Sequence, residues 1–321
     1  MRALLLLAFL PLLATFAPSS LTRYPDIPRH PHLWVEPVPL REGAPQARRV
    51  GVLTFIEGWW LRSNHPHFGG ISAMHVNGRS VVAISDGGMT MRFDVPSRAA
   101  RIPIHMQELV DAPGPGKKQR DSEAMAVHEG QAWIAFEREN AVFRYDPASW
   151  RSDASAQPEE MRRWSVNSGS EAMVRLRDGG FLIFAEGSRL RDGTSELLLF
   201  RGDPAVAGTK VVRMTYRPPT GFRITDAAEL PDGRLLFLNR RISLFDGILV
   251  KLTIAEKPDL GPGVEISGRE IAHFQPPVTT DNYEALSVVQ EGGRTILWIA
   301  SDDNFMGFQR TLLLKFALDQ R

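Results

Sequence analysis

Short apolar runs alternate with polar, glycine-containing turns along almost the whole chain after residue 49. Typical runs are SVVAISD (80–86), FLIFAEG (181–187) and TILWIAS (295–301). Runs of this length, rich in β-branched and aromatic residues and bounded by Gly or Asp, predict strands. No segment carries a convincing helical period, and the 27 Gly and 23 Pro favour many turns. The chain is therefore predicted to be all-β.

Five of the runs open with a related motif, in three cases Glu-Ala followed by Met or Leu. The five segments are GGISAMHV (69–76), DSEAMAVHEGQ (121–131), GSEAMVRLRDGG (169–180), TDAAELPDGR (225–234) and DNYEALSVVQEGGR (281–294). Each reaches a Gly turn, three further apolar runs follow, and the motif returns after about 50 residues, as in the blades of a propeller. The repeat predicts a β-propeller with five or six four-stranded antiparallel blades. A β-sandwich is the alternative, although it gives no reason for the motif to recur.

The two ends of the repeat region indicate how the chain is organised. Residues 1–20 contain one Arg, an apolar run and then small residues, which is the layout of a secretory signal peptide, with an uncleaved anchor as the alternative. Residues 21–48, rich in Pro and Arg, are expected to form an extended lead-in with little regular structure. The propeller then comprises residues 49–321, and residues 50–58 are expected to close it as the outer strand of the last blade. We expect a periplasmic or secreted monomer without stable membrane insertion after removal of the signal.

The motif carboxylates are predicted to gather at one rim of the propeller. In a hairpin, the start of the first strand and the end of the second lie at the same edge. If the motif strand is the innermost of each blade, the paired residues ring one mouth of the central channel. The predicted pairs are Ser72 with Asp86, Glu123 with Glu137, Glu171 with Glu186, Asp226 or Glu229 with Asn239 and Arg240, and Glu284 with Asp302 and Asp303.

Carboxylates crowded together need a cation, Arg partners or raised pKa values. Hard oxygen ligands suit Ca²⁺ or Mg²⁺, so the ring is a candidate metal site. The predicted ligands are Asp86, Glu123, Glu137, Glu171, Glu284 and Asp302. The alternative is structural, because each carboxylate could instead pair with an Arg of the neighbouring blade and hold the blades in register.

Composition narrows the chemistry further. A formal net charge of +1 gives no global field for nucleic acid or an anionic membrane. The absence of Cys excludes disulfides, thiolate chemistry and Cys-based zinc sites. There is no G-x-S-x-G elbow, Walker loop or H-E-x-x-H, and the eight His show no metal-binding spacing. Arg138, Arg240 and Arg310 are predicted near the rim, where a guanidinium could hold a phosphate or carboxylate group.

Several motifs resemble those of a known family. D-S-E-A-M (121–125), S-E-A-M (170–173), D-N-Y-E-A-L (281–286) and the terminal block SDDNF…QRTLLLKF (301–316) resemble the phytase-like family, which is described as having esterase-like activity. The similarity extends from about residue 50 to the end. It implies a β-propeller and hydrolysis of phosphate or other esters, with calcium as in the propeller phytases.

The leading hypothesis from the sequence is an exported hydrolase of phosphate or carboxylic esters, with a small-molecule substrate and a divalent cation in the carboxylate ring. Glu284 or Glu171 would act as the base, and Arg138, Arg240 and Arg310 would bind the anionic group. A calcium-dependent sugar-lactone hydrolase shares the metal requirement. The rival from another class is a non-enzymatic propeller that binds a ligand or protein, in which the ring of carboxylates is structural.

Overall fold

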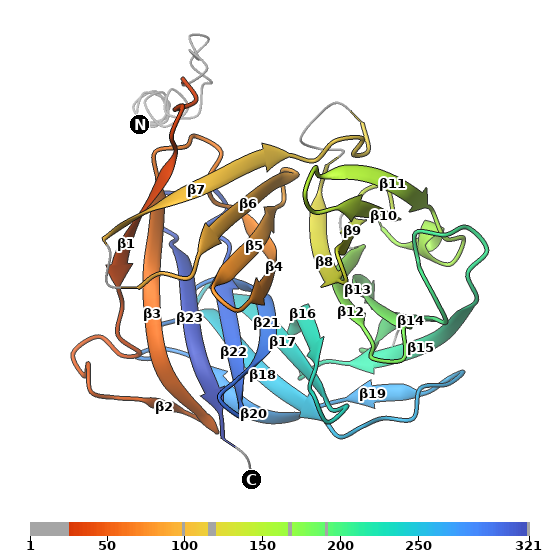
Figure 1. Cartoon of the computed structure of the whole chain (residues 1–321). Coiled ribbons are helices and arrows are strands. Elements are labelled where there is room, and N and C mark those ends of the chain that lie inside the picture. The colour runs from red at the N-terminus through yellow and green to blue at the C-terminus, as the bar shows by residue number, and fades with distance from the viewer. Residues whose placement is uncertain (1–25, 98–99, 115–119, 166–168, 190–191, 320–321) are drawn as a thin grey trace, which may run out of the picture.

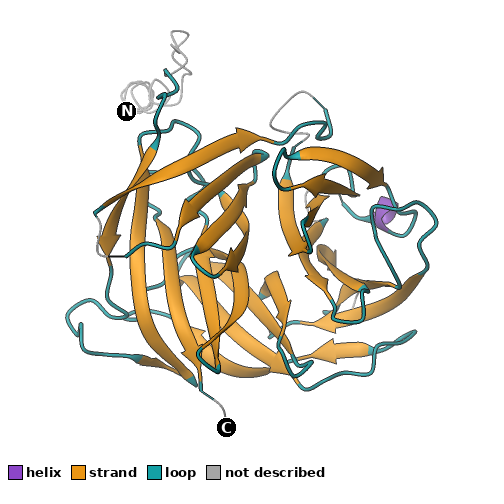
Figure 2. Ribbon diagram, in the orientation of Figure 1, coloured by secondary structure: helices purple, strands orange, loops and turns teal. Residues whose placement is uncertain are grey.

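The computed structural model describes residues 26–97, 100–114, 120–165, 169–189 and 192–319, so the predicted signal peptide lies outside the described residues. Strands make up nearly all of the regular structure, and a single 3₁₀ turn, Met161–Arg163, is the helical element of the described part (Figure 2). The all-β prediction is confirmed. A search of the described residues finds no helix with the length and apolarity needed to span a membrane.

Most strands fall into five groups of four, here called blades 1 to 5 and numbered from the N-terminus. Blade 1 consists of β4 (Ile71–Asn77), β5 (Ser80–Ser85), β6 (Met89–Asp94) and β7 (Arg101–Glu108). Blade 2 consists of β8 (Ser122–His128), β9 (Gln131–Phe136), β10 (Ala141–Asp146) and β11 (Arg151–Ala156). Blade 3 consists of β12 (Ser170–Arg175), β13 (Phe181–Arg189), β14 (Ser195–Phe200) and β15 (Val211–Arg217). Blade 4 consists of β16 (Arg223–Glu229), β17 (Leu235–Ser243), β18 (Gly247–Ala255) and β20 (Arg269–Phe274). Blade 5 consists of β21 (Tyr283–Glu291), β22 (Arg294–Ser301), β23 (Thr311–Leu318) and β3 (Leu53–Ser63).

The blades form a closed ring, which is the architecture of a β-propeller. The innermost strands are β4, β8, β12, β16 and β21, and they face a common centre in Figure 1. Each contacts the next, and β21 of the last blade contacts β4 of the first. As predicted, each innermost strand carries one copy of the motif. The closure is also as predicted, because β3 pairs antiparallel with β23 and leaves no open edge on that strand.

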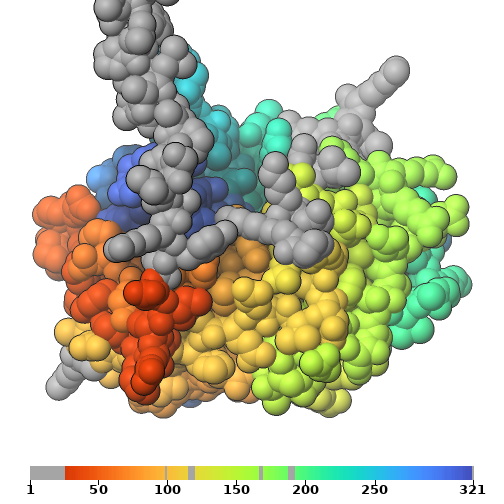
Figure 3. Space-filling model, turned by 90° about the horizontal axis from the view of Figure 1, so that it is seen from above, coloured from red at the N-terminus to blue at the C-terminus, as the bar shows by residue number. Residues whose placement is uncertain are grey.

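Short strands outside the blades join neighbouring blades. β1 (His32–Pro37) pairs with β3 of blade 5 and with β7 of blade 1. Figure 3 shows this red segment at the surface beside the yellow-orange of blade 1. The structure therefore differs from the expected lead-in, because its Pro-rich sequence still leaves His32–Val35 free to make strand hydrogen bonds. β19 (Glu265–Ser267) pairs in parallel with β15 and so joins blade 4 to blade 3, and β2 (Arg49–Val50) pairs with β3.

The core lies between the blades. Phe184 of blade 3 packs against Phe237 of blade 4, with ring centroids 5.8 Å apart. Trp59 on β3 stacks with Trp298 on β22 at 6.2 Å within blade 5. Alternate residues of each strand face opposite sides of the sheet, so both faces of an inner strand meet a neighbouring blade and must be apolar. This packing explains the continuous apolar runs in the sequence and holds the motif end of each inner strand in place.

Candidate metal centre

Every inner strand has a β-bulge at its motif. The register shifts between Ile71 and Ala73, Ser122 and Ala124, Ser170 and Ala172, Ile224 and Asp226, and Tyr283 and Ala285. The extra residue is therefore Glu123, Glu171 or Glu284 in blades 2, 3 and 5. A bulge leaves its extra residue unpaired and redirects the side chain. The repeated Glu thus sits at the same unusual backbone position in three blades, at the edge where the inner strands begin. We call this edge the site rim.

Hydroxyl residues occupy the bulge in the other two blades. Ser72 donates to the carbonyl of Ser122 at 2.6 Å, and Thr225 donates to the carbonyl of Tyr283 at 3.1 Å. Both acceptors directly precede the bulge Glu of the next blade. The hydroxyls therefore fasten one blade to the next, and only blades 2, 3 and 5 place a carboxylate at this position.

Blade 2 contributes three converging carboxylates. Asp121, Glu123 and Glu137 each offer a carboxylate oxygen, and these oxygens all lie within 4.8 Å of one another. Asp121 directly precedes β8 and Glu123 is the bulge residue of β8, so both lie where this strand begins at the site rim. Glu137 follows β9, where the hairpin returns to the site rim, as predicted. The predicted meeting of Glu123 and Glu137 is confirmed, and Asp121 is the member that the sequence analysis missed.

Glu123 and Glu137 both have raised pKa values. Burial raises the pKa of Glu123 well above its usual value, with further contributions from Glu171 and Asp121. Burial also raises the pKa of Glu137 to about 7, although its carboxylate accepts a hydrogen bond from the Gly169 amide at 3.1 Å. A side chain on Gly169 would clash with Glu137, because its Cβ would lie 2.8 Å from the Glu137 carbonyl oxygen and 3.0 Å from the Glu137 Cγ.

Glu171 joins the blade 2 cluster from blade 3. Burial raises its pKa well above the usual value, and Glu186 and Glu137 add to the effect. A side-chain hydrogen bond between Glu171 and Glu137 raises the pKa of Glu171 and lowers that of Glu137. Asp86 belongs to the same cluster because its charge raises the pKa of Glu123. We call Asp86, Asp121, Glu123, Glu137 and Glu171 the acidic half of the ring.

Around blade 4 the carboxylates form ion pairs with arginines. Arg240 contacts Glu284 and the Asn282 side chain, and its other terminal nitrogen lies 3.6 Å from Glu186. Arg223 adds a second ion pair to Glu186 at 2.9 Å. We call Glu186, Arg223, Arg240, Asn282 and Glu284 the paired half. By contrast, among the cationic side chains of the described residues, none lies within ion-pair distance of Glu123, Glu137 or Glu171.

A cleft of about 370 Å³ opens beside the paired half. Its lining residues are Glu186, Gly221, Arg223, Arg240, Arg241 and Ile242. Three guanidinium groups around one small cleft suit an anionic group of a ligand. Arg240, predicted to bind an anionic group, therefore lines a cleft that could hold one. Arg223 and Arg241 line the same cleft, and the sequence analysis did not select them as anion-binding residues.

The other two predicted Arg residues are engaged with carboxylates. Arg138 donates from Nε to Asp121 at 2.8 Å, at the border of the acidic half. Arg310 lies 3.5 Å from Asp281 and 3.8 Å from Glu42. Asp302 lies between the two halves, and burial raises its pKa to about 7, with Asp86 and Asp303 as the nearby acidic charges. Of Arg138 and Arg310, only Arg138 contacts a residue of the acidic half.

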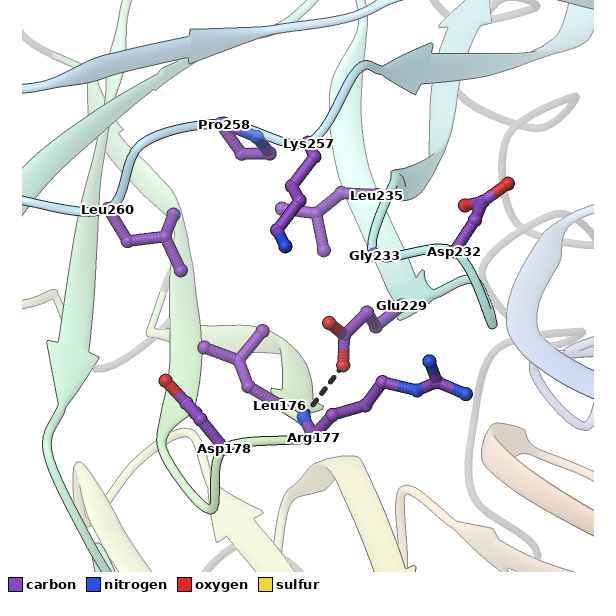
Figure 4. Close-up of a pocket in the computed structure, with 10 residues that line it drawn as sticks. All are labelled: Leu176, Arg177, Asp178, Glu229, Asp232, Gly233, Leu235, Lys257, Pro258 and Leu260. Carbon is purple, nitrogen blue, oxygen red and sulfur yellow. Dashed lines mark hydrogen bonds between the residues drawn. The ribbon is translucent and has the colours of Figure 1, made fainter.

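The predicted pairing in the fourth repeat, of Asp226 or Glu229 with Asn239 and Arg240, is wrong. Because Thr225 occupies the bulge, Asp226 lies opposite Leu238 and accepts hydrogen bonds from the amides of Ala227 and Leu286. Glu229 lies opposite Leu235, at the far end of β16. There it accepts a hydrogen bond from the Arg177 amide at 2.8 Å, in a cleft of about 270 Å³ on the opposite rim (Figure 4).

Asp303 has a structural role in the loop after β22. It accepts hydrogen bonds from the Gly70 amide at 2.9 Å, the Phe305 amide at 3.1 Å and the Thr311 hydroxyl at 2.8 Å. A carboxylate with three such donors holds the loop in shape. Asp302, its neighbour, is the residue of this pair whose environment connects it to the ring.

The acidic half fits a hard divalent cation. Oxygens bound to one Ca²⁺ lie about 2.4 Å from it, so two of them are at most about 4.8 Å apart. The three oxygens of Asp121, Glu123 and Glu137 meet this limit. All are carboxylate oxygens, the donors that Ca²⁺ and Mg²⁺ prefer. The raised pKa values of Glu123 and Glu137 favour protonation in the absence of a metal, and a bound cation would displace those protons.

Comparison with known proteins identifies the family. The phytase-like family model, described as "Esterase-like activity of phytase", matches residues 66–305. The chain belongs to this family. The match contains the start of every inner strand and therefore the whole site rim of this phytase-like domain. A search of curated protein sequences finds no match to the chain.

Solved structures of other proteins share the fold only distantly. Glutaminyl cyclase from Myxococcus xanthus aligns with 12% identity and a TM-score of 0.47, covering 83% of this chain and 96% of the cyclase. The Cellvibrio cellulosa α-L-arabinanase, in complex with arabinohexaose, aligns with 12% identity and a TM-score of 0.47, covering 77% of this chain and 92% of that one. The β-propeller domain of Myceliophteria thermophila Cps50 (Swd1) aligns with 9% identity and a TM-score of 0.38, covering 83% of this chain and 78% of that domain.

Proposed function

We propose that this phytase-like protein is an exported, metal-assisted hydrolase of phosphate or carboxylic esters. The observation that carries the proposal is the convergence of Asp121, Glu123 and Glu137, whose oxygens lie within 4.8 Å of one another. Such a cluster is costly unless a cation or protons compensate it. Family membership supports ester chemistry, although the fold by itself hosts many functions.

The cation, Ca²⁺ or Mg²⁺, would polarise the ester oxygen and lower the pKa of a bound water. Asp121, Glu123 and Glu137 are the proposed ligands, with Asp86 and Asp302 at the border of the site. Glu171 is the proposed proton carrier, because burial raises the pKa of its carboxyl group well above the usual value and a hydrogen bond joins it to Glu137. A carboxyl group with a raised pKa can protonate a leaving oxygen near neutral pH.

The paired half would bind the anionic part of the substrate. Arg240 and Arg223 line the cleft of about 370 Å³ and are oriented by Glu186 and Glu284. Glu284, predicted as a base, faces Arg240, so we assign it the role of orienting that guanidinium. Arg138 and Arg310 are each paired with an Asp, which leaves them as weaker candidates for substrate contact.

The remaining expectations stay part of the proposal. The substrate is a small molecule, the mature protein is a periplasmic or secreted monomer, and neither nucleic acid nor stable membrane insertion is involved. The leader-like residues 1–20 and the net charge of +1 support these expectations. Five is the blade number that we propose for the whole protein, because β21 contacts β4 and the ring of described strands closes.

A non-enzymatic binding propeller is the second candidate. The paired half favours it, because Arg240 compensates Glu284 and Glu186 as a purely structural ring would require. In that case any cation in the acidic half would only stabilise the fold. The two candidates differ in whether metal binding is accompanied by ester turnover.

Thermal unfolding with and without metal tests the centre directly. We expect the melting temperature of the EDTA-treated protein to rise by several degrees with Ca²⁺, Mg²⁺ or Mn²⁺ at about 100 times its Kd, because a ligand bound only to the folded state stabilises it. Glu123→Gln should abolish the rise. Glu229→Gln is the matched control, since Glu229 lies on the opposite rim. A wild-type protein that responds to none of the three metals would exclude the metal-assisted mechanism.

Ester turnover decides between the two candidates once metal binding is established. We expect the metal-loaded wild type to hydrolyse phosphate or carboxylic esters, Glu171→Gln to lose at least about 100-fold in kcat, and Glu229→Gln to keep its activity. Metal binding without turnover of any ester would favour the binding propeller.

A further inference from the structure

A second cleft opens on the site rim, next to the acidic half. It has a volume of about 330 Å³. Its lining residues are Pro66, His67, Ser85, Gly87, Met89, Glu108, Arg120 and Phe305. Ser85 and Gly87 flank Asp86 in the chain, and Arg120 precedes Asp121. The wall of this cleft, here called the side cleft, is therefore continuous with two carboxylates of the acidic half.

The side cleft differs in charge from the cleft at Arg240. Glu108 and Arg120 in its lining form an ion pair at 2.7 Å and neutralise each other, and His67 adds an imidazole ring. Pro66, Met89 and Phe305 give it apolar surface. An uncharged, partly apolar cleft binds an uncharged organic group more readily than a phosphate or carboxylate.

Phe305 is placed against the acidic half by close packing on Gly70. A Cβ on Gly70 would lie 2.6 Å from Cε2 of Phe305 and 2.8 Å from Oδ1 of Asp86. The aromatic ring and the carboxylate therefore approach the same backbone atom, and only glycine fits between them. Gly70 also has a φ of +63°, which glycine adopts readily. The apolar wall and the acidic half meet at this residue.

The loop that carries Phe305 is held in a strained shape. Asn304 and Phe305 have φ values of +48° and +53°, and a bulky residue in this left-handed region is unusual. Asp303 fixes the loop by accepting hydrogen bonds from the amides of Gly70 and Phe305. Backbone strain that the surrounding structure enforces is frequent where a side chain is positioned for function.

We propose that the side cleft binds an uncharged aromatic or short alkyl group of the ester whose scissile bond lies at the acidic half. The inference rests on the proposed function and narrows its substrate class to esters that combine one polar or anionic end with one apolar group. The volume is sufficient, because a cavity of about 150 Å³ already holds benzene. Each methylene buried in the cleft should tighten binding about four-fold.

Two non-hydrolysable probes of equal charge test the side cleft: phenylphosphonate and methylphosphonate, titrated calorimetrically into the Ca²⁺-loaded protein. We expect phenylphosphonate to bind at least ten-fold more tightly than methylphosphonate. Phe305→Ala should reduce this ratio to near one. The matched control is Phe308→Ala, from the same loop, whose side chain is 82% exposed and does not line the cleft; it should keep the wild-type ratio.

Because Phe305→Ala could alter the loop structure, a second variant tests the cleft without changing this loop. Met89→Gln keeps the size of the side chain but makes the cleft more polar, and should lower the ratio several-fold. Equal binding of the two probes by wild type, or an unchanged ratio in Phe305→Ala, would overturn the inference while leaving the metal centre intact. If neither probe binds and no metal raises the melting temperature, the proposed function itself fails and the inference falls with it.

Discussion

The acidic half and the paired half of the ring differ in what compensates the repulsion between their crowded carboxylates. In both, carboxylates of neighbouring blades are brought together at the site rim. Arg240 compensates Glu284 and, together with Arg223, Glu186 in the paired half, whereas burial and neighbouring carboxylates raise the pKa of Glu123 and Glu171 in the acidic half. An internal Arg completes a structural pair, but protons can be exchanged for a cation. The difference indicates that the carboxylates of the paired half hold arginine side chains in position, whereas those of the acidic half bind a metal ion.

The largest expected effect is on the paired half. Arg240→Met should destabilise the protein by about 3–5 kcal/mol, because it leaves the buried carboxylate of Glu284 without its cation. Denaturant unfolding measures the loss. The control Arg151→Met breaks an exposed pair with Asp111 and should cost under about 1 kcal/mol. Equal losses in both variants would remove the distinction between the two halves.

We expect the acidic half to make the stability of the metal-free protein depend on pH. Glu137 keeps its proton in the folded state up to a pKa of about 7, against 4.5 for the ordinary group. The folded state therefore binds more protons between these values, and stability falls as pH rises through this window, by up to about 3 kcal/mol. Unfolding in EDTA across pH 4–8 should show this fall in wild type and a smaller one in Glu137→Gln.

Calcium supplies the control for the pH experiment. Because a bound cation takes the place of the proton on Glu137, saturating Ca²⁺ should flatten the stability profile of wild type between about pH 4.5 and 7 and have little effect on Glu137→Gln. Identical profiles for the two proteins in EDTA would mean that Glu137 does not hold the proton that the cluster requires.

Asp226 tests whether a motif carboxylate outside both halves is purely structural. Asp226→Ala should cost about 1–3 kcal/mol, because the buried amides of Ala227 and Leu286 lose their acceptor. The rise in melting temperature with Ca²⁺ should be unchanged. Asp232→Ala, at an exposed turn of the same blade, is the control and should change stability by about 0.5 kcal/mol or less. Loss of the Ca²⁺ response in Asp226→Ala would extend the metal centre into blade 4.

The smallest effect is expected at the border of the acidic half. Arg138→Met removes a partly exposed ion pair with Asp121 and should change stability by under about 1 kcal/mol. It should raise Ca²⁺ affinity a few-fold, since the guanidinium no longer competes with the cation for Asp121. Calorimetric titration measures the affinity, with Arg151→Met as the control. Weaker Ca²⁺ binding in Arg138→Met would show that Arg138 positions Asp121 instead of competing for it.

Much of this architecture could be predicted from local pattern alone. The strand runs, the repeat, the motif on each inner strand and the closure by the segment around residues 50–58 follow from alternation, turn residues and spacing, which are properties of short stretches of chain. The meeting of Glu123 with Glu137 followed from hairpin geometry in the same way. The lead-in was less predictable, because β1 exists only through pairing with β3 and β7.

The sequence by itself determined an all-β repeat protein whose motif carboxylates collect on one rim, since strand formation and hairpin direction depend on near neighbours in the chain. Only the tertiary structure decided which carboxylates lie next to an Arg guanidinium and which lie next to other carboxylates. The choice depends on the bulge, which places Thr225 where the other blades have Ser or Glu, and on Arg240 reaching from blade 4 to Glu284 in blade 5. Contacts between blades set these distances, and no local pattern encodes them.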